Sequence, residues 1–202
     1  MDRLKRITVG IDEVGIGCLA GPIMIAAVCL PKGFNDACVK DSKTVRKSQM
    51  LRALTVIKDK ALWWRCLKIS VTTVDRIGTW AAWDKGVAKL VRGAQEFKDN
   101  APIIIDGTRV PDTVSDTVMV STLKKGDTLN YAIAAASILA KCYRDRYMQD
   151  LDTTFPFYGW GSNVGYGTPE HMAAIDEHGL TIHHRQAATR TARLNKLRKG
   201  IR

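Results

Sequence analysis

The chain has 202 residues, 46% of them hydrophobic, and a formal net charge of +11 at pH 7. The length suits one domain, or one domain with a small appendage. No apolar run approaches the roughly 18 residues of a membrane span, and the N-terminus lacks the apolar core and cleavage site of a secretory signal. The five cysteines are scattered without a Cys-x-x-Cys pair, which argues against a disulfide framework and a thiolate zinc site. We therefore expect a cytoplasmic protein.

The strong positive charge indicates a polyanionic partner, and nucleic acid is the first candidate. The alternative is charge that serves solubility alone. The distribution is uneven, because no acidic residue follows Glu177. The basic residues after it are Arg185, Arg190, Arg193, Lys196, Arg198, Lys199 and Arg202. This tail is either a phosphate-binding arm or a solvated helix end.

Hydrophobic spacing and turn signals predict strands and helices along the whole chain. The expected strands are residues 7–11, 23–30, 62–71, 102–106 and 117–121. The expected helices are residues 48–58, 73–77, 80–97 and 128–151. Strands come first as a run and then alternate with helices, a pattern that favours an α/β fold with a mixed sheet between helices. In such sheets, functional sites form beyond the carboxyl ends of the strands.

Acidic residues stand at the ends of two predicted strands. Asp12 and Glu13 follow the first strand, Asp106 ends the fourth, and Asp127 precedes the long helix. Carboxylates gathered around one point repel each other unless a cation joins them, and Mg²⁺ or Mn²⁺ prefers such oxygen ligands. Two such ions about 3.5–4 Å apart can hold the attacking and leaving oxygens of a phosphodiester. These acids on a basic protein therefore predict a metal-dependent nuclease.

Each acid also has a simpler interpretation. Asp127 is well placed to cap the N-terminus of the long helix, and Asp106 with Gly107 could form only a turn after a strand. Because Asp12 and Glu13 are adjacent, a regular strand points them to opposite faces of the sheet. They could share a metal site only if the backbone bends there, which the nearby glycines would permit.

The stretch from Gly15 to Ala20 also matches the dinucleotide-binding pattern Gly-x-Gly-x-x-Gly/Ala. That motif needs a helix after it, because the pyrophosphate binds at the helix N-terminus. Here Gly21-Pro22 and a strand-like run follow, and two acids stand where the pyrophosphate must approach. A nucleotide cofactor is therefore disfavoured.

Five motifs, in the right order, resemble those of the type 2 ribonucleases H, the ribonuclease HII family. They are GIDEVGIGCLAGP, KDSKTV, IIIDG, KKGDTLNYAIAAASILAKCYRDRYM and GYGTPEHMAAIDEHGLTIHHR. The resemblance implies an RNase H-like fold, with a five-stranded mixed sheet flanked by helices and a C-terminal helical segment. We expect a catalytic core over residues 1–152, and a substrate-contacting segment with the basic tail over residues 153–202, together forming one structural unit.

The resemblance also implies an activity. Members of the family cut the RNA strand of an RNA–DNA hybrid internally, leaving 5′-phosphate and 3′-hydroxyl ends; ribonucleotide-containing duplex DNA is the other expected partner. Matched by motif, the catalytic and metal-binding acids are Asp12, Glu13, Asp106 and Asp127, which would hold two Mg²⁺ or Mn²⁺ ions. Asp145 is a rival for the fourth acid, but it lies about five helical turns beyond Asp127, so both cannot readily serve one site.

The same resemblance implies how the RNA sugar is recognised. In the family, a Gly-Arg-Gly turn reads 2′-hydroxyls through backbone groups, and a tyrosine packs on the sugar at the RNA-to-DNA junction. The matching residues are Gly15, Ile16, Gly17 and Tyr166. Lys43, in the Asp-Ser-Lys loop, is either a phosphate contact or a solvated loop lysine.

The sequence departs from the family pattern where cations are expected near the junction. Ile16 replaces the arginine between the glycines, Val164 replaces a lysine, and residues 184–187 read His-Arg-Gln-Ala instead of an Arg-Arg-Ser-Phe-like end. We expect hybrid cleavage to be kept and the preference for a single ribonucleotide within DNA to be weakened. The basic tail could replace the lost phosphate contacts.

Two competing functions remain open at this point. One is a catalytically weak nucleic-acid-binding protein that kept the fold while its substrate loops changed; the four intact acids argue against it, whereas Ile16 and Val164 argue for it. The other is ribonuclease HIII, a sister type whose extra N-terminal domain has no room before the first motif.

Trp160, in a glycine-rich loop, is the best candidate for stacking on bases, and the histidine spacing fits no standard zinc pattern. We expect a monomer and no membrane association.

Overall fold

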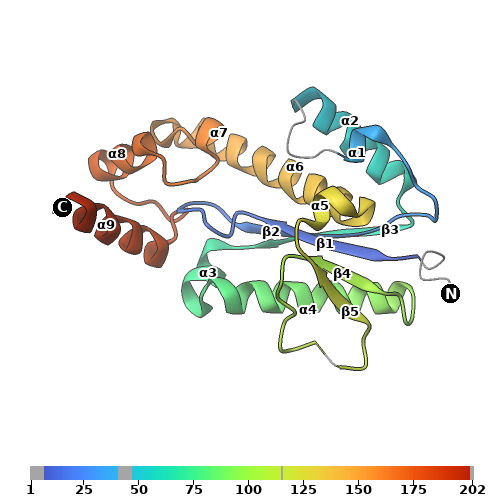
Figure 1. Cartoon of the computed structure of the whole chain (residues 1–202). Helices are drawn as coiled ribbons and strands as arrows, with labels where there is room; N and C mark the ends of the chain where they lie inside the picture. The colour runs from blue at the N-terminus through green and yellow to red at the C-terminus, as the bar shows by residue number, and fades with distance from the viewer. Residues whose placement is uncertain (1–6, 41–46, 115, 201–202) are drawn as a thin grey trace. The chain divides into compact units, whose positions relative to one another are not determined.

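The computed structural model describes residues 7–40, 47–114 and 116–200 (Figure 1). These residues form two compact units. Of the described residues, the first unit contains 7–14, 24–40, 47–68, 83–114 and 116–142, and the second contains 15–23, 69–82 and 143–200. All four expected acids belong to the first unit, whereas the expected sugar-reading residues belong to the second.

The first unit is built on a five-stranded mixed sheet with the strand order β3-β2-β1-β4-β5. Its strands are β1 (Val9–Val14), β2 (Ile23–Cys29), β3 (Trp63–Ile69), β4 (Ile103–Asp106) and β5 (Val120–Leu123). β1 is antiparallel to β2 and parallel to β4, which is parallel to β5. The expected mixed sheet is confirmed. The last strand lies a few residues later than predicted, because Val120–Leu123 is the stretch that pairs with β4.

Helices cover both faces of this sheet. They are α1 (Ala37–Lys40), α2 (Lys47–Lys60), α4 (Thr79–Phe97), α5 (Gly126–Leu129) and α6 (Tyr131–Thr154). In Figure 1, α4 lies along one face, and α5 with the first half of α6 lies along the other. The residues of β1 alternate accordingly, since Gly10 faces α6 and Glu13 faces α4.

α6 approaches the sheet closely at Gly10. A Cβ atom at this position would lie 2.2 Å from the carbonyl carbon of Ala132, so only glycine fits beneath the helix. The first turns of α6 consist largely of small buried residues, namely Ala132, Ala134, Ala135 and Ala136. This close packing brings the polar Ser137 of α6 to β1.

The second unit has a core of its own. Its helices are α3 (Val71–Ile77), the 3-10 helix η2 (Pro156–Tyr158), α7 (Trp160–Asn163), α8 (Pro169–His178), α9 (Gln186–Gly200) and the second half of α6. Its core includes Leu19, Met148, Tyr158, Trp160, Met172 and Ile175. Across the described part of the chain, no helix is long and apolar enough to cross a membrane.

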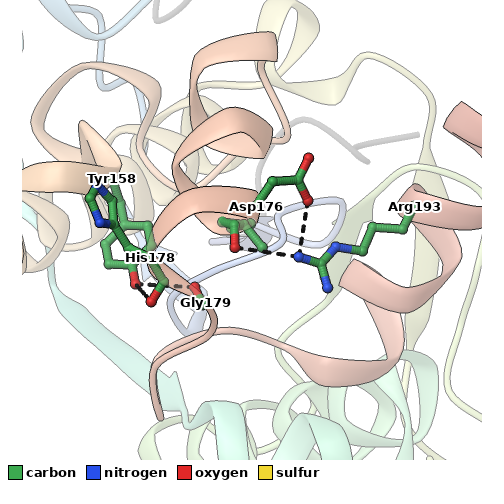
Figure 2. A network of polar contacts seen from close by, with 6 residues as sticks. Tyr158, Asp176, His178, Gly179 and Arg193 are labelled. Atoms are coloured by element: carbon green, nitrogen blue, oxygen red, sulfur yellow. Dashed lines mark hydrogen bonds and ion pairs between the residues drawn. The ribbon is translucent and has the colours of Figure 1, made fainter.

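Polar contacts tie the C-terminal end of α8 to its neighbours (Figure 2). The Tyr158 hydroxyl donates a hydrogen bond of 3.1 Å to the carbonyl of Gly179. Arg193, on α9, donates through Nη2 to Oδ1 of Asp176 at 3.0 Å and to the carbonyl of Ile175 at 3.3 Å. The Ile175 carbonyl also accepts from the backbone N of Gly179 at 3.0 Å, so Arg193 adds a second donor at this end of α8 while it pairs with the Asp176 carboxylate. α9, which begins the basic tail, is thereby held against α8.

Candidate active site

Two of the expected acids are neighbours on β1 and point to opposite faces of the sheet. Asp12 is 6% exposed and forms a side-chain hydrogen bond with Ser137 on α6. Glu13 is half-buried, and its Oε2 accepts a hydrogen bond of 3.1 Å from Nε1 of Trp83 on α4. β1 stays paired with β2 through Val14, so the bend that a shared site was expected to require is not present. The two carboxylates therefore lie at the same end of the sheet, one on each face.

Asp106 ends β4, the parallel neighbour of β1. Ile11 pairs with Ile105 across the two strands, which places Asp106 beside Asp12. The Oδ1 atom of Asp106 accepts a hydrogen bond of 2.7 Å from the backbone N of Gly126, the first residue of α5. The turn expected after β4 is present, and this carboxylate also anchors the next helix.

Asp127 lies in the first turn of α5 and is only 2% exposed. The expectation that it caps the long helix is wrong, because α6 begins only at Tyr131. Oδ1 of Asn130 accepts hydrogen bonds from the backbone N of Ala132 at 2.8 Å and of Ile133 at 3.2 Å. Asn130 therefore caps α6, and helix capping does not account for the buried Asp127 carboxylate.

Burial and mutual repulsion disturb the ionisation of these acids. Burial raises the pKa of Asp12 to about 8, and the charges of Glu13 and Asp106 add to the rise, against the opposing hydrogen bond from Ser137. The pKa of Glu13 is also raised, chiefly by burial, although the hydrogen bond from Trp83 lowers it. Buried carboxylates that repel one another favour a bound cation, which would restore their ionised form.

The donor chemistry of this cluster fits a hard divalent ion, because every candidate ligand is a carboxylate oxygen. Asp12, Glu13 and Asp106 interact electrostatically with one another. Within residues 7–40, 47–114 and 116–200, however, no three Asp, Glu, His or Cys side chains form a group that could hold a metal ion. The fold therefore gathers the acids without completing a coordination shell, and their side chains would have to turn toward an ion.

The residues expected to read the sugar lie in the second unit. Gly15 is buried with a φ of 92°, Ile16 is half-buried, and Gly17 is exposed. The ring of Tyr166 is exposed. The second unit thus places an exposed backbone turn and an exposed aromatic ring at the surface. Lys43 lies outside the described residues.

The prediction that Trp160 stacks on bases is wrong, because this side chain is fully buried. Its Nε1 donates a hydrogen bond of 3.0 Å to Nε2 of His171, which lies 3.3 Å from Nε2 of His184. Nδ1 of His171 lies 2.8 Å from the carbonyl of Tyr166. A carbonyl can only accept, so this nitrogen bears the proton. The buried cluster therefore holds the backbone of the exposed tyrosine.

The buried histidine pair predicts a pH dependence of stability. Burial, together with the neighbouring His171, lowers the pKa of His184 from 6.5 to about 4. Because the pKa of His184 is lower in the folded protein than its ordinary value, the folded state favours the neutral ring. The contribution of this neutral ring to stability is complete above pH 6.5 and is lost as the pH falls toward 4. We expect the melting-temperature advantage of the wild type over His184→Asn to shrink between about pH 7.5 and pH 4.5. A difference that does not change with pH in thermal melts would contradict this expectation.

Trp83 is expected to support metal binding through Glu13. Trp83 is 2% exposed, and a phenylalanine would keep most of its packing while removing the N–H donor to Glu13. Loss of a partner that orients a metal ligand typically costs about 10–100-fold in metal affinity or activity. We expect Trp83→Phe to raise the Mg²⁺ concentration for half-maximal cleavage by at least about 10-fold. The matched control is Trp80→Phe, an exposed tryptophan on the same helix, and an equal metal dependence in both variants would rule the role out.

The residues that support the acids and the turn were not predicted from the sequence. Ser137 could have been noticed, because it is a single hydroxyl within an alanine-rich run of α6. Trp83 gave no local signal, since its partner Glu13 is 70 residues away in the sequence. The buried Arg144 gave no local signal either, since two of the carbonyls that it binds, those of Pro22 and Ala20, are 122 and 124 residues away.

Comparison with known proteins identifies the family. The model of the family "Ribonuclease HII" matches residues 9–193. Ribonuclease HII of Salinibacter ruber is 39% identical over 189 residues, covering 93% of each chain. Ribonuclease HII of Bacteroides thetaiotaomicron is 41% identical over 186 residues, covering 89% of this chain and 88% of the relative.

Solved structures share the fold at lower identity. Ribonuclease HII of Archaeoglobus fulgidus, solved in complex with PCNA, has a TM-score of 0.71 at 24% identity and covers 89% of this chain and 94% of its own. Ribonuclease H2 of Pyrococcus horikoshii OT3 has a TM-score of 0.72 at 20% identity, over 91% of this chain and 95% of its own. The expected RNase H-like fold is confirmed. By its sequence match over nearly its whole length, the chain belongs to the ribonuclease HII family of metal-dependent endonucleases, which hydrolyse the RNA strand of RNA–DNA hybrids.

Proposed function

We propose that this chain hydrolyses RNA with two divalent ions held by Asp12, Glu13, Asp106 and Asp127, leaving 5′-phosphate and 3′-hydroxyl ends. The proposal rests on one observation above all: three of these acids interact at the ends of β1 and β4, where burial and repulsion raise the pKa of Asp12 to about 8. A ribonuclease HIII solved in complex with Mn²⁺ shares the fold, with a TM-score of 0.70 at 20% identity, and supports a divalent ion here. Mg²⁺ and Mn²⁺ both suit the carboxylate set.

When bound, the ions would activate the attacking water and stabilise the leaving oxygen. The residues of the chain prepare the carboxylates for that task. Asp12 and Asp106 stand side by side on parallel strands, so both carboxylates would be available as ligands to a bound ion. The backbone N–H of Gly126 orients the Asp106 carboxylate, and the Trp83 indole orients that of Glu13.

Recognition of RNA is proposed for the second unit. Gly15 and Gly17 would offer backbone groups to a 2′-hydroxyl, the group that distinguishes RNA from DNA, and the exposed Tyr166 would pack on the sugar. Ile16 cannot supply an ionic contact to phosphate, so a long hybrid should be preferred over one embedded ribonucleotide. The basic residues of α9 and Lys43 are proposed phosphate contacts.

The chain is proposed to act as a monomer in the cytoplasm, as expected from the sequence. The Archaeoglobus neighbour was solved with PCNA, which supports a search for a protein partner of this chain as well.

The deciding experiment is the cleavage of three labelled duplexes, each with Mg²⁺ and again with Mn²⁺. They are a long RNA–DNA hybrid, a DNA duplex with one embedded ribonucleotide, and plain DNA. We expect cleavage of the hybrid, weaker cleavage of the single-ribonucleotide duplex and none of DNA. The variant Ile16→Arg should raise single-ribonucleotide cleavage relative to the hybrid.

The other outcomes are equally informative. Binding of the hybrid without cleavage of any duplex would replace this proposal with the nucleic-acid-binding alternative. Equal cleavage of the hybrid and the single-ribonucleotide duplex would overturn the proposed effect of Ile16 while leaving the nuclease activity in place.

A further inference from the structure

Two arginines hold the loop of residues 15–22 from inside the second unit. Arg144, on α6, is 0% exposed, and Arg185, just before α9, is 1% exposed. Arg144 donates hydrogen bonds of 3.0 Å through Nε to the carbonyl of Pro22 and through Nη2 to that of Ala20. Buried guanidinium groups are costly unless their donors are used. Arg144 uses its third donor, Nη1, on the carbonyl of Val164 at 2.7 Å, outside the loop, whereas Nη2 of the buried Arg185 has no hydrogen-bond partner among the described residues.

Arg185 binds the same loop nearer its tip. Its Nε donates to the carbonyl of Gly21 and its Nη1 to that of Ile16, both at 2.9 Å. Its backbone N donates to the carbonyl of Leu19 at 2.7 Å. The two arginines therefore turn five loop carbonyls toward the interior.

The orientation of one of these carbonyls fixes a group on the surface. In a planar trans peptide, the C=O and the N–H point in opposite directions. Since Arg185 draws the Ile16 carbonyl inward, the N–H of Gly17 is directed away from the buried guanidinium. Gly17 is exposed, and a Cβ built on it would have no atom within 4 Å. The space beside this donor is therefore open to a ligand.

The arrangement depends on the first glycine of the turn as well. A Cβ at Gly15 would lie 2.3 Å from Nε of Arg144, so a larger residue would displace the guanidinium from its place under the loop. The two glycines of the turn thus have different tasks. Because Gly15 has no side chain, the guanidinium of Arg144 fits beneath it, and because Gly17 has none, the outer side of the loop stays open.

The buried guanidinium also supplies positive charge beneath the turn. Burial lowers the pKa of Arg185 to about 10, still well above neutrality. Of the groups that act on it, namely Cys18, Arg144, Asp75 and Tyr166, only Asp75 is a carboxylic acid. Oδ2 of Asp75 accepts a hydrogen bond of 3.2 Å from the backbone N of Gln186. A backbone N–H that points outward, with a buried cation behind it, favours the binding of an electronegative oxygen atom, such as those of the sugar–phosphate backbone.

We infer that Arg185, supported by Arg144, is a positioning residue for substrate binding, because it presents the Gly17 N–H to an oxygen of the nucleic-acid backbone. This inference rests on the proposed function and deepens it. The family pattern places a cationic side chain at position 16. In this chain isoleucine stands there, and the contact is made by the backbone amide above the buried Arg185 guanidinium.

Arg185→Lys tests the inference, because lysine keeps the charge but cannot span the carbonyls of Ile16 and Gly21 as a planar fork does. We expect KM for the hybrid to rise about 3–10-fold, the range for one lost hydrogen bond, with kcat changed less than about twofold. The affinity ratio between hybrid and plain DNA should fall, and the salt dependence of binding should stay the same. Arg76→Lys, an exposed arginine on α3, is the matched control and should change none of these quantities.

Gly17→Ala keeps the inference testable if Arg185→Lys fails to fold. The added methyl meets no protein atom, so the melting temperature should stay unchanged while the methyl blocks the approach to the N–H. Unchanged KM and unchanged hybrid-to-DNA ratio in folded Gly17→Ala would overturn the inference.

A binding measurement distinguishes failure of the positioning role from failure of the proposed function. Binding is measured by fluorescence anisotropy with every variant also carrying Asp106→Asn. A wild type that binds hybrids without cutting them would refute the proposed function alone. Equal hybrid affinity with and without the loop substitutions would refute the positioning role alone.

Discussion

Replacing Asp106 with asparagine is expected to reduce hybrid cleavage more than about 100-fold, beyond the range seen when only a supporting partner of a metal ligand is lost. Asparagine keeps the oxygen that accepts the 2.7 Å hydrogen bond from Gly126, so α5 should stay anchored. It removes the negative charge that acts on Asp12 and Glu13. The melting temperature without metal should therefore not fall below that of the wild type.

Initial rates on the long hybrid, measured with Mg²⁺ and with Mn²⁺, check this expectation. Asp59→Asn is the matched control, because Asp59 is an exposed acid of the same unit that pairs with Lys60. Cleavage within about tenfold of the wild type in Asp106→Asn would remove this residue from the catalytic set. A large fall in the melting temperature would instead show that Asp106 serves chiefly to hold α5.

Gly10→Ala is expected to have the largest effect on stability. The new Cβ would lie 2.2 Å from the carbonyl carbon of Ala132 and 2.3 Å from the backbone N of Ile133. Backbone atoms cannot move aside as the end of a flexible side chain can, so β1 and α6 must separate. We expect a loss of at least about 3 kcal/mol, the upper end of typical overpacking costs. For a chain of this length that corresponds to a fall of roughly 6–12 °C in the melting temperature.

Thermal and denaturant unfolding measure this loss, with Gly17→Ala as the control glycine that has open space around it. The activity should fall together with stability, because α6 also supplies Ser137 to Asp12. A Gly10→Ala protein that melts like the wild type would mean that α6 does not pack on β1 as closely as described.

The sheet and three of its acids could be predicted from the sequence because both leave a local signal. Apolar runs predict strands, and acids at their ends are seldom structural, so Asp12, Glu13 and Asp106 were found before any contact was known. In the structure, β1 and β4 are neighbours and these acids interact. The bend expected between Asp12 and Glu13 is not present, since the acids remain on opposite faces of a regular strand.

Features that depend on distant contacts gave no such signal. The break between α5 and α6 depends on Asn130 capping the second helix, whereas the sequence alone reads as one continuous helix. Trp160 stands in a glycine-rich loop that suggests exposure, yet it fills the core of its unit. The bond from Arg185 to Ile16 joins residues 169 positions apart, and no periodicity or motif predicts it.

The way the loop of residues 15–22 is held has an evolutionary consequence. Its shape is fixed through main-chain carbonyls, so the outer side chains can mutate without loss of the turn. We therefore expect position 16 to accept either isoleucine or a cation while the loop keeps its conformation. A nuclease engineer would then choose this position to change substrate preference by a single substitution.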